Sequence, residues 1–207
     1  MGLTGSIFSF AIKRKLRKDN PAHGIDMPSD VKRLRRLSNS EYQQLWKAIN
    51  SGATHQIASD VFLFLVLTGW RSGEAKNLKF SELDLERKAA LLGDTKTGVS
   101  IRPLSGAAIE IIKRQKAADV YVFGKPIENL NPNWKRFAMP SDVTPHTLRH
   151  SFASLAADLG LADHTIAGLL GHARRSITSR YMHLADKALI EAADLVAGHT
   201  EHLMRGS

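Results

Sequence analysis

Arginine, histidine and tyrosine gather in three short segments of this 207-residue sequence. Segment 68–74 carries an arginine at the predicted start of a helix. Segment 145–150 carries a histidine and an arginine three residues apart, a spacing that puts both on one helix face. Segment 169–181 ends on a tyrosine that follows a histidine. The candidate functional residues of the three segments are Arg71, His146, Arg149, His172 and Tyr181.

These residue types suit the cleavage of a phosphodiester bond. Guanidinium groups keep their charge and present a planar fork, so Arg71 and Arg149 could grip the non-bridging oxygens of one phosphate. Tyr181 could attack phosphorus and form a phosphotyrosine. Because a tyrosine hydroxyl has an ordinary pKa of about 10, a histidine would have to accept its proton. Lys96, at the tip of a predicted hairpin, could protonate the departing oxygen, and Lys88 and Lys113 are alternatives of the same type.

The segments that position these residues are predicted to be mostly helical. Spacing of apolar residues predicts a helix over 7–18, and Asn20-Pro21 ends it. Ser38 and Glu41 form a capping box that begins a second helix. Residues 57–67 are apolar nearly all round, as in a buried central helix. These patterns predict an α-rich core.

The rest of the chain adds a small sheet and more helices. Residues 83–104, with a turn at 94–98, predict a β-hairpin or a small antiparallel sheet, and 120–123 predict a further short strand. Ser105 caps a helix, and helices begin at Asn131-Pro132 and at Thr144-Pro145, the latter running to Leu159 and ending at Gly160. Three more helices are predicted from the caps Asp163, Ser176 and Asp186, the last ending near Ala197. The predicted fold class is mostly α with a small antiparallel β-sheet (α+β).

Composition and charge favour a globular protein that meets a polyanion. Apolar residues make up 43% and charged residues 24% of the chain, cysteine is absent, and the net charge is +9. Residues 1–40 hold nine basic and three acidic residues, so most of the excess lies there. Such a field attracts nucleic acid. No apolar run reaches the roughly 18 residues that a membrane span needs, so the sequence predicts a cytoplasmic protein without a membrane partner.

The order of the functional residues resembles that of the tyrosine recombinases, or phage integrases. That family carries Arg, Lys, His-x-x-Arg, His or Trp, and Tyr in this order, matched here by Arg71, Lys96, His146, Arg149, His172 and Tyr181. The resemblance implies a tyrosine recombinase catalytic-domain fold. It assigns Glu74 to the support of the first arginine, and His150, one turn beyond His146, is expected in a supporting role.

The resemblance also implies the reaction, the partners and the domains. Such enzymes cut one DNA strand, form a 3′-phosphotyrosine, and act as homotetramers on two DNA duplexes without a metal or other cofactor. Integration or excision of a phage or genomic island is the expected role, in a bacterial cytoplasm at the nucleoid, and the isolated chain is expected to be a monomer. The expected parts are the last helix of a truncated N-terminal core-binding domain with candidate vector-derived residues (1–18), a linker (19–37), the catalytic domain (38–197), and a partly vector-derived C-terminal tail (198–207).

Other interpretations stay open at the level of sequence. Within the family's chemistry, Xer-like resolution of chromosome dimers, transposon mobility or a type IB topoisomerase would use a similar set of residues. His146 and His150 have a spacing that can chelate zinc, with His172 as a third ligand, although the glutamate of His-Glu-x-x-His is missing. A DNA-binding module without chemistry would explain the charge but not the tyrosine.

Overall fold

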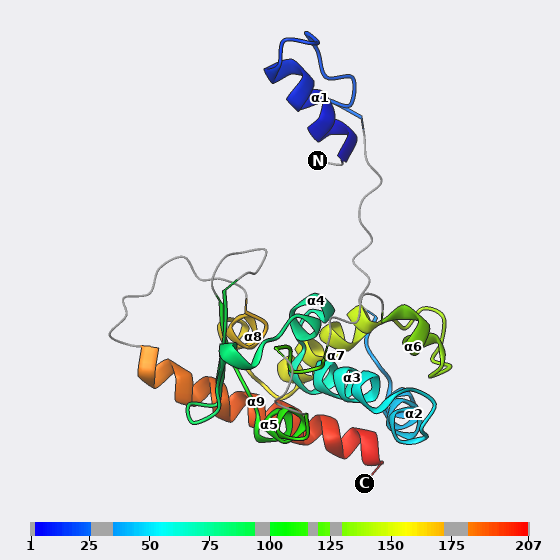
Figure 1. Cartoon of the computed structure of the whole chain (residues 1–207), viewed down its shortest axis with the longest axis vertical. Helices are drawn as coiled ribbons and strands as arrows, with labels where there is room; N and C mark the ends of the chain where they lie inside the picture. The colour runs from blue at the N-terminus through cyan, green and yellow to red at the C-terminus, as the bar shows by residue number, and fades with distance from the viewer. Residues whose placement is uncertain are drawn as a thin grey trace. The chain divides into compact units, whose positions relative to one another are not determined.

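The computed structural model describes residues 3–25, 35–93, 100–115, 120–124, 130–171 and 182–206, the last range with side chains from 187 onward. The chain forms two compact units, Met1–Arg33 and Leu34–Ser207. The second unit holds most of the helices and the sheet (Figure 1). Within the described residues, no helix is both long enough and apolar enough to cross a membrane.

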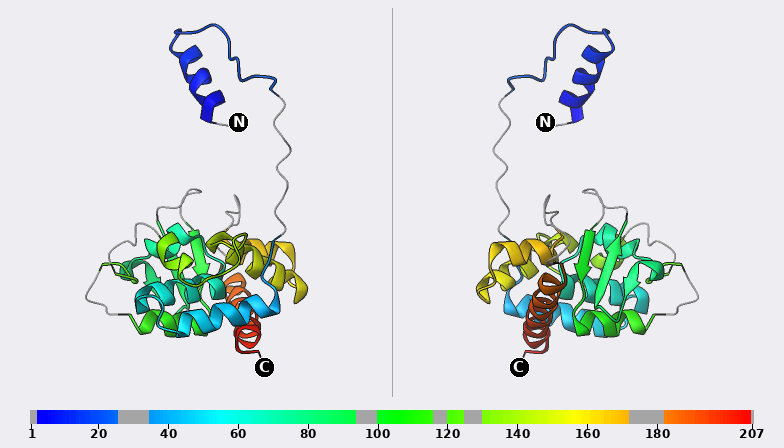
Figure 2. Two further views of the ribbon diagram at one scale, coloured as in Figure 1. Left: turned by 90° about the vertical axis from the view of Figure 1, so that its right-hand side faces the viewer. Right: turned by 90° about the vertical axis from the view of Figure 1, so that its left-hand side faces the viewer.

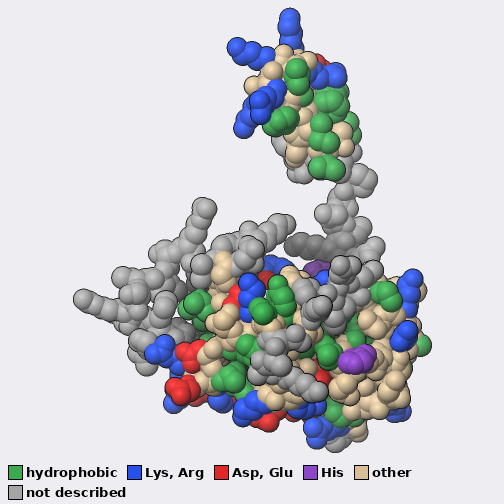
Figure 3. Space-filling view, in the orientation of Figure 1, with side chains coloured by type: hydrophobic (Ala, Val, Ile, Leu, Met, Phe, Trp, Pro, Cys, Tyr) green, Lys and Arg blue, Asp and Glu red, His purple; other side chains and the backbone are tan. Residues whose placement is uncertain are grey.

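Among its described residues, 3–25, the first unit contains one helix, α1 (Leu3–Lys13). It ends before the predicted Lys18 because Lys15 takes a positive φ of 57° and the Leu16 amide donates back to the Ala11 carbonyl at 3.0 Å. Asn20 then donates to the Gly5 carbonyl at 3.2 Å and closes the unit on itself. Figure 3 shows basic and apolar side chains together on its surface. The exposed apolar side chains are Leu3, Ile7, Phe10, Ile12 and Leu16.

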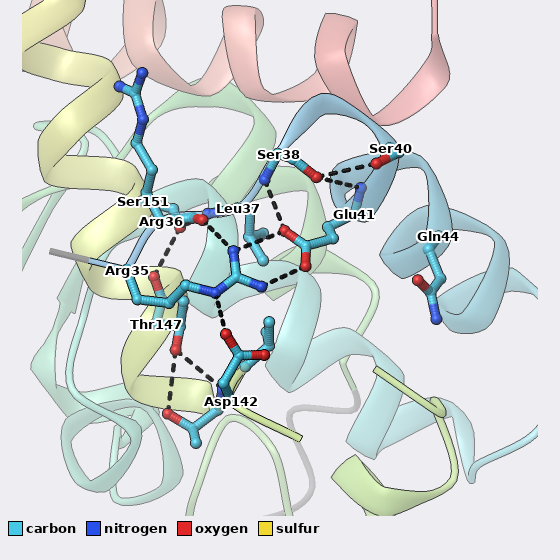
Figure 4. Close-up of polar contacts among 12 residues, drawn as sticks. Arg35, Arg36, Leu37, Ser38, Ser40, Glu41, Gln44, Asp142, Thr147 and Ser151 are labelled. Atoms are coloured by element: carbon cyan, nitrogen blue, oxygen red, sulfur yellow. Dashed lines mark hydrogen bonds and ion pairs between the residues drawn. The ribbon is translucent and has the colours of Figure 1, made fainter. Parts of the chain in front are cut away.

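The chain enters the second unit through a network of hydrogen bonds around Arg35 (Figure 4). The Arg35 guanidinium donates to Asp142 at 2.6 Å and to Glu41 at 2.9 Å. The Leu37 amide donates to the Ser151 hydroxyl at 2.8 Å in a buried position. Residues 35–37, predicted as the end of a linker, are therefore fixed on the second unit.

The predicted capping box forms as expected at the start of α2 (Asn39–Asn50). The Glu41 amide donates to the Ser38 hydroxyl at 3.3 Å, and the Ser38 amide donates to the Glu41 carboxylate at 2.8 Å. Tyr42, Leu45 and Ile49 of this helix are buried. The reciprocal bonds satisfy backbone donors that the first turn would otherwise leave open.

The core is built around α3 (Gln56–Thr68), whose residues from Ala58 onward are all buried, as the sequence predicts. It packs against α2, α5 (Gly106–Lys113), α7 (Pro145–Asp158) and the C-terminal helix α9 (Met182–Arg205). Phe62 lies 5.1 Å from the ring of Trp134, and Phe64 lies 5.2 Å from that of Trp70. Aromatic and aliphatic side chains of α3 thus hold the surrounding helices in place.

A three-stranded antiparallel sheet confirms the predicted hairpin region. Its strands are β1 (Leu83–Asp84), β2 (Ala89–Leu92) and β3 (Ser100–Pro103), in the order β1-β2-β3. A short 3₁₀ turn, η1 (Phe80–Glu82), precedes β1. The strand predicted at 120–123 is wrong, because Tyr121 makes only an isolated bridge with Lys79 and the flanking residues form a turn. The class is mostly helical with a small antiparallel sheet, as predicted.

The remaining helices refine several predicted boundaries. Between α3 and the sheet lies α4 (Ser72–Lys76), and after α5 comes α6 (Asn131–Lys135), which includes Asn131 rather than starting after it. The helix α7 begins after Thr144, as predicted. The next helix, α8 (Asp163–Leu169), has Ala162 at its N-cap in place of Asp163. The cap predicted at Ser176 lies outside the described residues.

The last helix is longer than predicted at both ends. Helix α9 runs from Met182 to Arg205 rather than from Asp186 to Ala197. Residues 198–205, expected as a tail, continue this helix because Thr200 and Met204 are buried and Arg205 stacks on the Trp46 ring at 5.6 Å. Figure 1 shows α9 running along the second unit past α8, α5 and α2, against which it packs, and Figure 2 views this helix nearly end-on.

Candidate active site

A cleft of about 490 Å³ opens where the start of α4 faces the start of α7. Trp70 lines this cleft together with basic and acidic residues. The basic and acidic residues are Arg71, Glu74, Glu82, His146 and Arg149. These residues come from segments that are far apart in the sequence. The structure therefore brings together four of the residues singled out above, namely Arg71, Glu74, His146 and Arg149.

Arg71 and Glu74 are held by the local geometry of α4. Gly69 ends α3 with a φ of +64°, which turns the chain so that Arg71 becomes the N-cap of α4. The Glu74 carboxylate reaches back, accepting from the Arg71 amide at 3.0 Å and from its Nη1 at 2.8 Å. Glu74 thus bonds both the main chain and the side chain of Arg71, and its expected supporting role stays a prediction. The Arg71 side chain stays 38% exposed and borders the cleft.

Arg149 is buried and bonded to two main-chain carbonyls. Its Nη1 donates to the Gly69 carbonyl at 2.8 Å, and its Nη2 donates to the Leu170 carbonyl at 3.1 Å. These bonds join the end of α3, the middle of α7 and the end of α8. Burial, and then the positive charges of Arg71 and Arg102, lower the pKa of Arg149 to about 10. The group stays charged at neutral pH in a field of other cations.

His146 lies one turn before Arg149 on α7 and lines the cleft. Partial burial, followed by the charges of His150, Arg149 and Arg71, lowers its pKa below the ordinary 6.5. A neutral imidazole at pH 7 can accept a proton. His150 contacts His146 edge to face, with 4.6 Å between ring centroids. His150 is not part of the cleft lining, and its supporting role stays a prediction.

Sequence reasoning missed one charged residue behind the cleft. Arg102 on β3 is fully buried, and its Nη2 donates to Glu74 at 2.7 Å. Burial lowers the pKa of Arg102, and the Glu74 charge partly opposes this effect. The one available signal was an arginine inside a predicted strand. Strand alternation puts Ile101 and Arg102 on opposite faces, and an apolar residue is more often the buried one of such a pair, so this signal does not identify Arg102 as buried.

Lys96, His172 and Tyr181 lie outside the described residues, and so do the turn 94–99 and the segment 172–181. Described residues that flank these segments either line the cleft or bond to one of its arginines. Leu92, which pairs with Ser100 across the hairpin, lines the cleft. Gly171 precedes His172, and its neighbour Leu170 accepts a hydrogen bond from Arg149.

The two alternative lysines are engaged elsewhere. Lys88 lies 3.6 Å from Asp194 of α9, and Lys113 pairs with Glu110 of α5 at 2.9 Å. Neither lines the cleft. Among the described residues, no group of three histidine, aspartate or glutamate side chains gathers that could hold a metal ion.

Comparison with known proteins points to one family. A model described as the phage integrase family matches residues 35–188. The chain is 27% identical to the tyrosine recombinase XerC of Bacillus pumilus (strain SAFR-032), with 89% of this chain and 68% of that protein covered. It is also 27% identical to XerD of Lacticaseibacillus casei, with 88% and 70% covered.

Solved structures share the fold. The integrase from mycobacterium phage Brujita superposes with a TM-score of 0.62 at 21% identity, covering 93% of this chain and 69% of that chain. A lambda integrase (75–356) dimer bound to a COC′ core site gives a TM-score of 0.59 at 17% identity, covering 86% and 73%. The mostly helical arrangement with a small sheet is thus that of integrase catalytic cores.

Proposed function

The chain belongs to the phage integrase family, the tyrosine-type site-specific recombinases that break and rejoin DNA, and we therefore propose that its cleft binds the scissile phosphate of double-stranded DNA. The observation that carries this proposal is the meeting of Arg71 and Arg149 at one cleft from separate helices. Two fixed guanidinium groups can neutralise the charge that develops on phosphate oxygens in the transition state.

The electrostatics of the cleft support an anionic substrate. Arg149 is desolvated and repelled by neighbouring arginines, and both effects lower its pKa. Glu74 and Glu82 supply carboxylates at the same cleft, but Glu74 already bonds two arginines. A phosphate bound between Arg71 and Arg149 would relieve the repulsion, so binding would be favoured by the charges already in place.

The proposed reaction proceeds through a covalent intermediate. The Tyr181 oxygen attacks phosphorus, the bond between phosphorus and the 5′ oxygen breaks, and a 3′-phosphotyrosine forms. His146 accepts the tyrosine proton, and Lys96 gives a proton to the departing 5′ oxygen. Arg71, Arg149 and His172 hold the phosphate. A 5′ hydroxyl from a second duplex then attacks the phosphotyrosine and releases Tyr181, so the rejoining step needs no cofactor.

We propose integration or excision of a phage or genomic island as the biological role. The match to the phage integrase model supports it. Xer-like resolution of chromosome dimers is the second candidate, because curated relatives are named XerC and XerD. Recovery of the trapped DNA target from genomic fragments distinguishes the two. A target at the junction of a mobile element supports the first role, and a single chromosomal site without such an element supports the second.

The proposed assembly is a homotetramer on two duplexes, formed from chains that are monomers without DNA. A lambda integrase, whose fold this chain shares, was crystallised as a dimer on its core site. Analytical ultracentrifugation with the recovered target duplex would show whether a complex of four chains and two duplexes forms. Complexes that stop at one chain per duplex would contradict the tetramer.

We also propose that residues 1–18, which contain α1, are the end of a DNA-clamping domain and that the expected linker, residues 19–37, follows it. The basic residues and exposed apolar residues around α1 support this proposal. The double change Lys13→Glu with Arg14→Glu should weaken duplex binding and flatten its dependence on salt. An unchanged affinity would contradict a contact between this segment and DNA.

Covalent trapping tests the proposed chemistry directly. The protein is mixed with a pool of nicked duplexes whose short 5′-hydroxyl strand is lost on cleavage, and the products are run on a denaturing gel. We expect a protease-sensitive adduct that is absent with Tyr181→Phe. The matched control is Tyr42→Phe, because Tyr42 is buried and desolvation raises its pKa to about 12. An adduct that persists in Tyr181→Phe would refute the assignment of the nucleophile.

The role of Lys96 has its own test. A duplex with a 5′-thio leaving group does not need a proton donor, since a thiolate leaves readily. Cleavage by Lys96→Ala should therefore be slow on the ordinary duplex and restored on the thio duplex. A thio duplex that gives no rescue would exclude Lys96 as the general acid.

A further inference from the structure

Arg102 is a buried cation on β3. The alternation of side chains along a strand does not by itself require the arginine, rather than its apolar neighbour, to face the core. Its side chain is 0% exposed, while the neighbouring Ile101 is 43% exposed on the outer face of β3. A buried guanidinium is retained only where partners offset the loss of its hydration. Here the partners are the Glu74 carboxylate at 2.7 Å and the Trp70 ring at 5.6 Å. Nε and Nη1 of Arg102 find no hydrogen-bond acceptor among the described residues.

Glu74 is shared between two arginines. Its Oε1 lies 2.8 Å from Nη1 of Arg71 and 2.7 Å from Nη2 of Arg102. A single carboxylate paired with Arg71 alone would form a neutral pair at the cleft and weaken the attraction for an anion. With Arg102 present, two guanidinium groups face one carboxylate, so Arg71 keeps uncompensated positive charge toward the cleft.

Arg102 also packs on the turn that follows α8. Gly171 has a φ of +64°, and a Cβ built on it would lie 1.9 Å from Cζ of Arg102. The guanidinium therefore rests directly on the Gly171 main chain. The preceding residue, Leu170, accepts a hydrogen bond from Arg149 at 3.1 Å. Both arginines thus hold the same turn, one from β3 and one from α7.

We propose that Arg102 is a positioning residue for the phosphate-binding arginines: it offsets the charge of Glu74, which keeps Arg71 available to an anionic phosphate, and it fixes the Gly171 turn against which Arg149 is bonded. The inference deepens the function proposed above and rests on it for the identity of the anion. Arg102 itself does not touch the phosphate, because no part of its side chain reaches the surface.

Two variants at this position separate charge from packing. Arg102→Met keeps an unbranched side chain and removes the charge, and the Glu74 carboxylate is not left unpaired because it still bonds Arg71. Arg102→Lys keeps the charge. The control for total charge is Arg87→Met, because the Arg87 side chain is 78% exposed and lies 3.7 Å from its partner Asp84. Thermal unfolding of each variant shows that it is folded before binding is measured.

Binding of inorganic phosphate is the first readout. It is monitored by the NMR signal of the His146 ring, which lies in the cleft. We expect Arg102→Met to weaken phosphate binding about tenfold, with Arg102→Lys and Arg87→Met within about threefold of the unchanged protein. Equal phosphate affinity in Arg102→Met and Arg87→Met overturns the inference. So does an unchanged protein whose His146 signal does not respond to phosphate at any concentration.

Cleavage is the second readout and depends on substrate charge. On a trapped target duplex, Arg102→Met should lose about 10- to 100-fold in rate with the natural phosphodiester. The loss should be much smaller with a neutral methylphosphonate at the scissile position, because there is no phosphate charge for Arg71 to meet. An equal loss on both substrates would mean that Arg102 only supports the fold. A failure of the proposed chemistry would be seen in a different experiment, as an adduct that still forms with Tyr181→Phe. In that case the phosphate titration would still test the role of Arg102.

Discussion

Replacing Gly171 with alanine measures how tightly the turn after α8 packs on the buried arginine of β3. The new Cβ would lie 1.9 Å from Cζ and 2.0 Å from Nη1 of Arg102, so the guanidinium has to move. A left-handed alanine costs about 1–2 kcal/mol. Displacing Arg102 from Glu74 removes a charge-assisted hydrogen bond worth about 1.5–3 kcal/mol. We expect Gly171→Ala to lower the free energy of unfolding by about 2.5–5 kcal/mol, as measured by denaturant titration.

The matched control is Gly160→Ala. Gly160 has a similar φ of +79°, and a Cβ added there would meet no described atom within 4 Å. Only the backbone cost of about 1–2 kcal/mol should therefore appear at this position. When Arg102 is first changed to alanine, the cost of Gly171→Ala should fall toward that of Gly160→Ala. Equal costs for the two glycines in the unchanged protein would mean that the contact with Arg102 contributes nothing to stability, contrary to this prediction.

Three further predictions concern a carboxylate, a histidine and the core. Hydrogen bonds from Arg35 lower the pKa of Glu41 from 4.5 to about 2. Glu41→Gln should therefore lower the free energy of unfolding by about 1.5–3 kcal/mol above pH 4.5. This loss should shrink as the pH falls toward 2, because the carboxylate of the unfolded chain is then protonated. Urea titrations at pH 6 and pH 3.5 that give the same difference would contradict it. The NMR titration midpoint of His146 should lie below pH 6.5. His150→Gln should raise this midpoint, because the charge of a neighbouring imidazole is removed. A His146 midpoint that is the same in His150→Gln would rule out coupling between the two rings. In denaturant titration, Phe62→Ala should lower the free energy of unfolding by about 3–5 kcal/mol. Leu91→Ala, at a side chain that is 54% exposed, should change it by no more than about 0.5 kcal/mol. Similar losses at both positions would contradict the assignment of Phe62 to the core.

Local sequence signals were sufficient for several elements. The capping box of Ser38 and Glu41 acts over three residues, and the two side chains bond as predicted. The buried helix α3 follows from an apolar run that no exposed helix would tolerate. Proline after Thr144 and glycine at position 160 mark the start and end of α7. These signals are carried by neighbouring residues, so folding of the rest of the chain does not change them.

Elements that depend on distant partners were predicted less well. Helix α9 extends to Arg205 because Met204 is buried and Arg205 lies against Trp46 of α2, contacts that no local pattern reveals. The segment 120–123 has the apolar character of a strand, but it finds one bridge partner, Lys79, and not a strand. Tertiary packing determined both outcomes.

For the candidate site, residue types and their order along the chain were enough to identify Arg71, His146 and Arg149 as candidates. Their meeting at one cleft depends on the packing of α4 and α7 around the end of α3, which the linear order does not contain. Which face of β3 is turned to the core, so that Arg102 is buried and Ile101 is exposed, likewise depends on the folded chain. Strand alternation requires only that two neighbours face opposite ways, and the carboxylate of Glu74, from a different helix, makes the inward position favourable for the arginine.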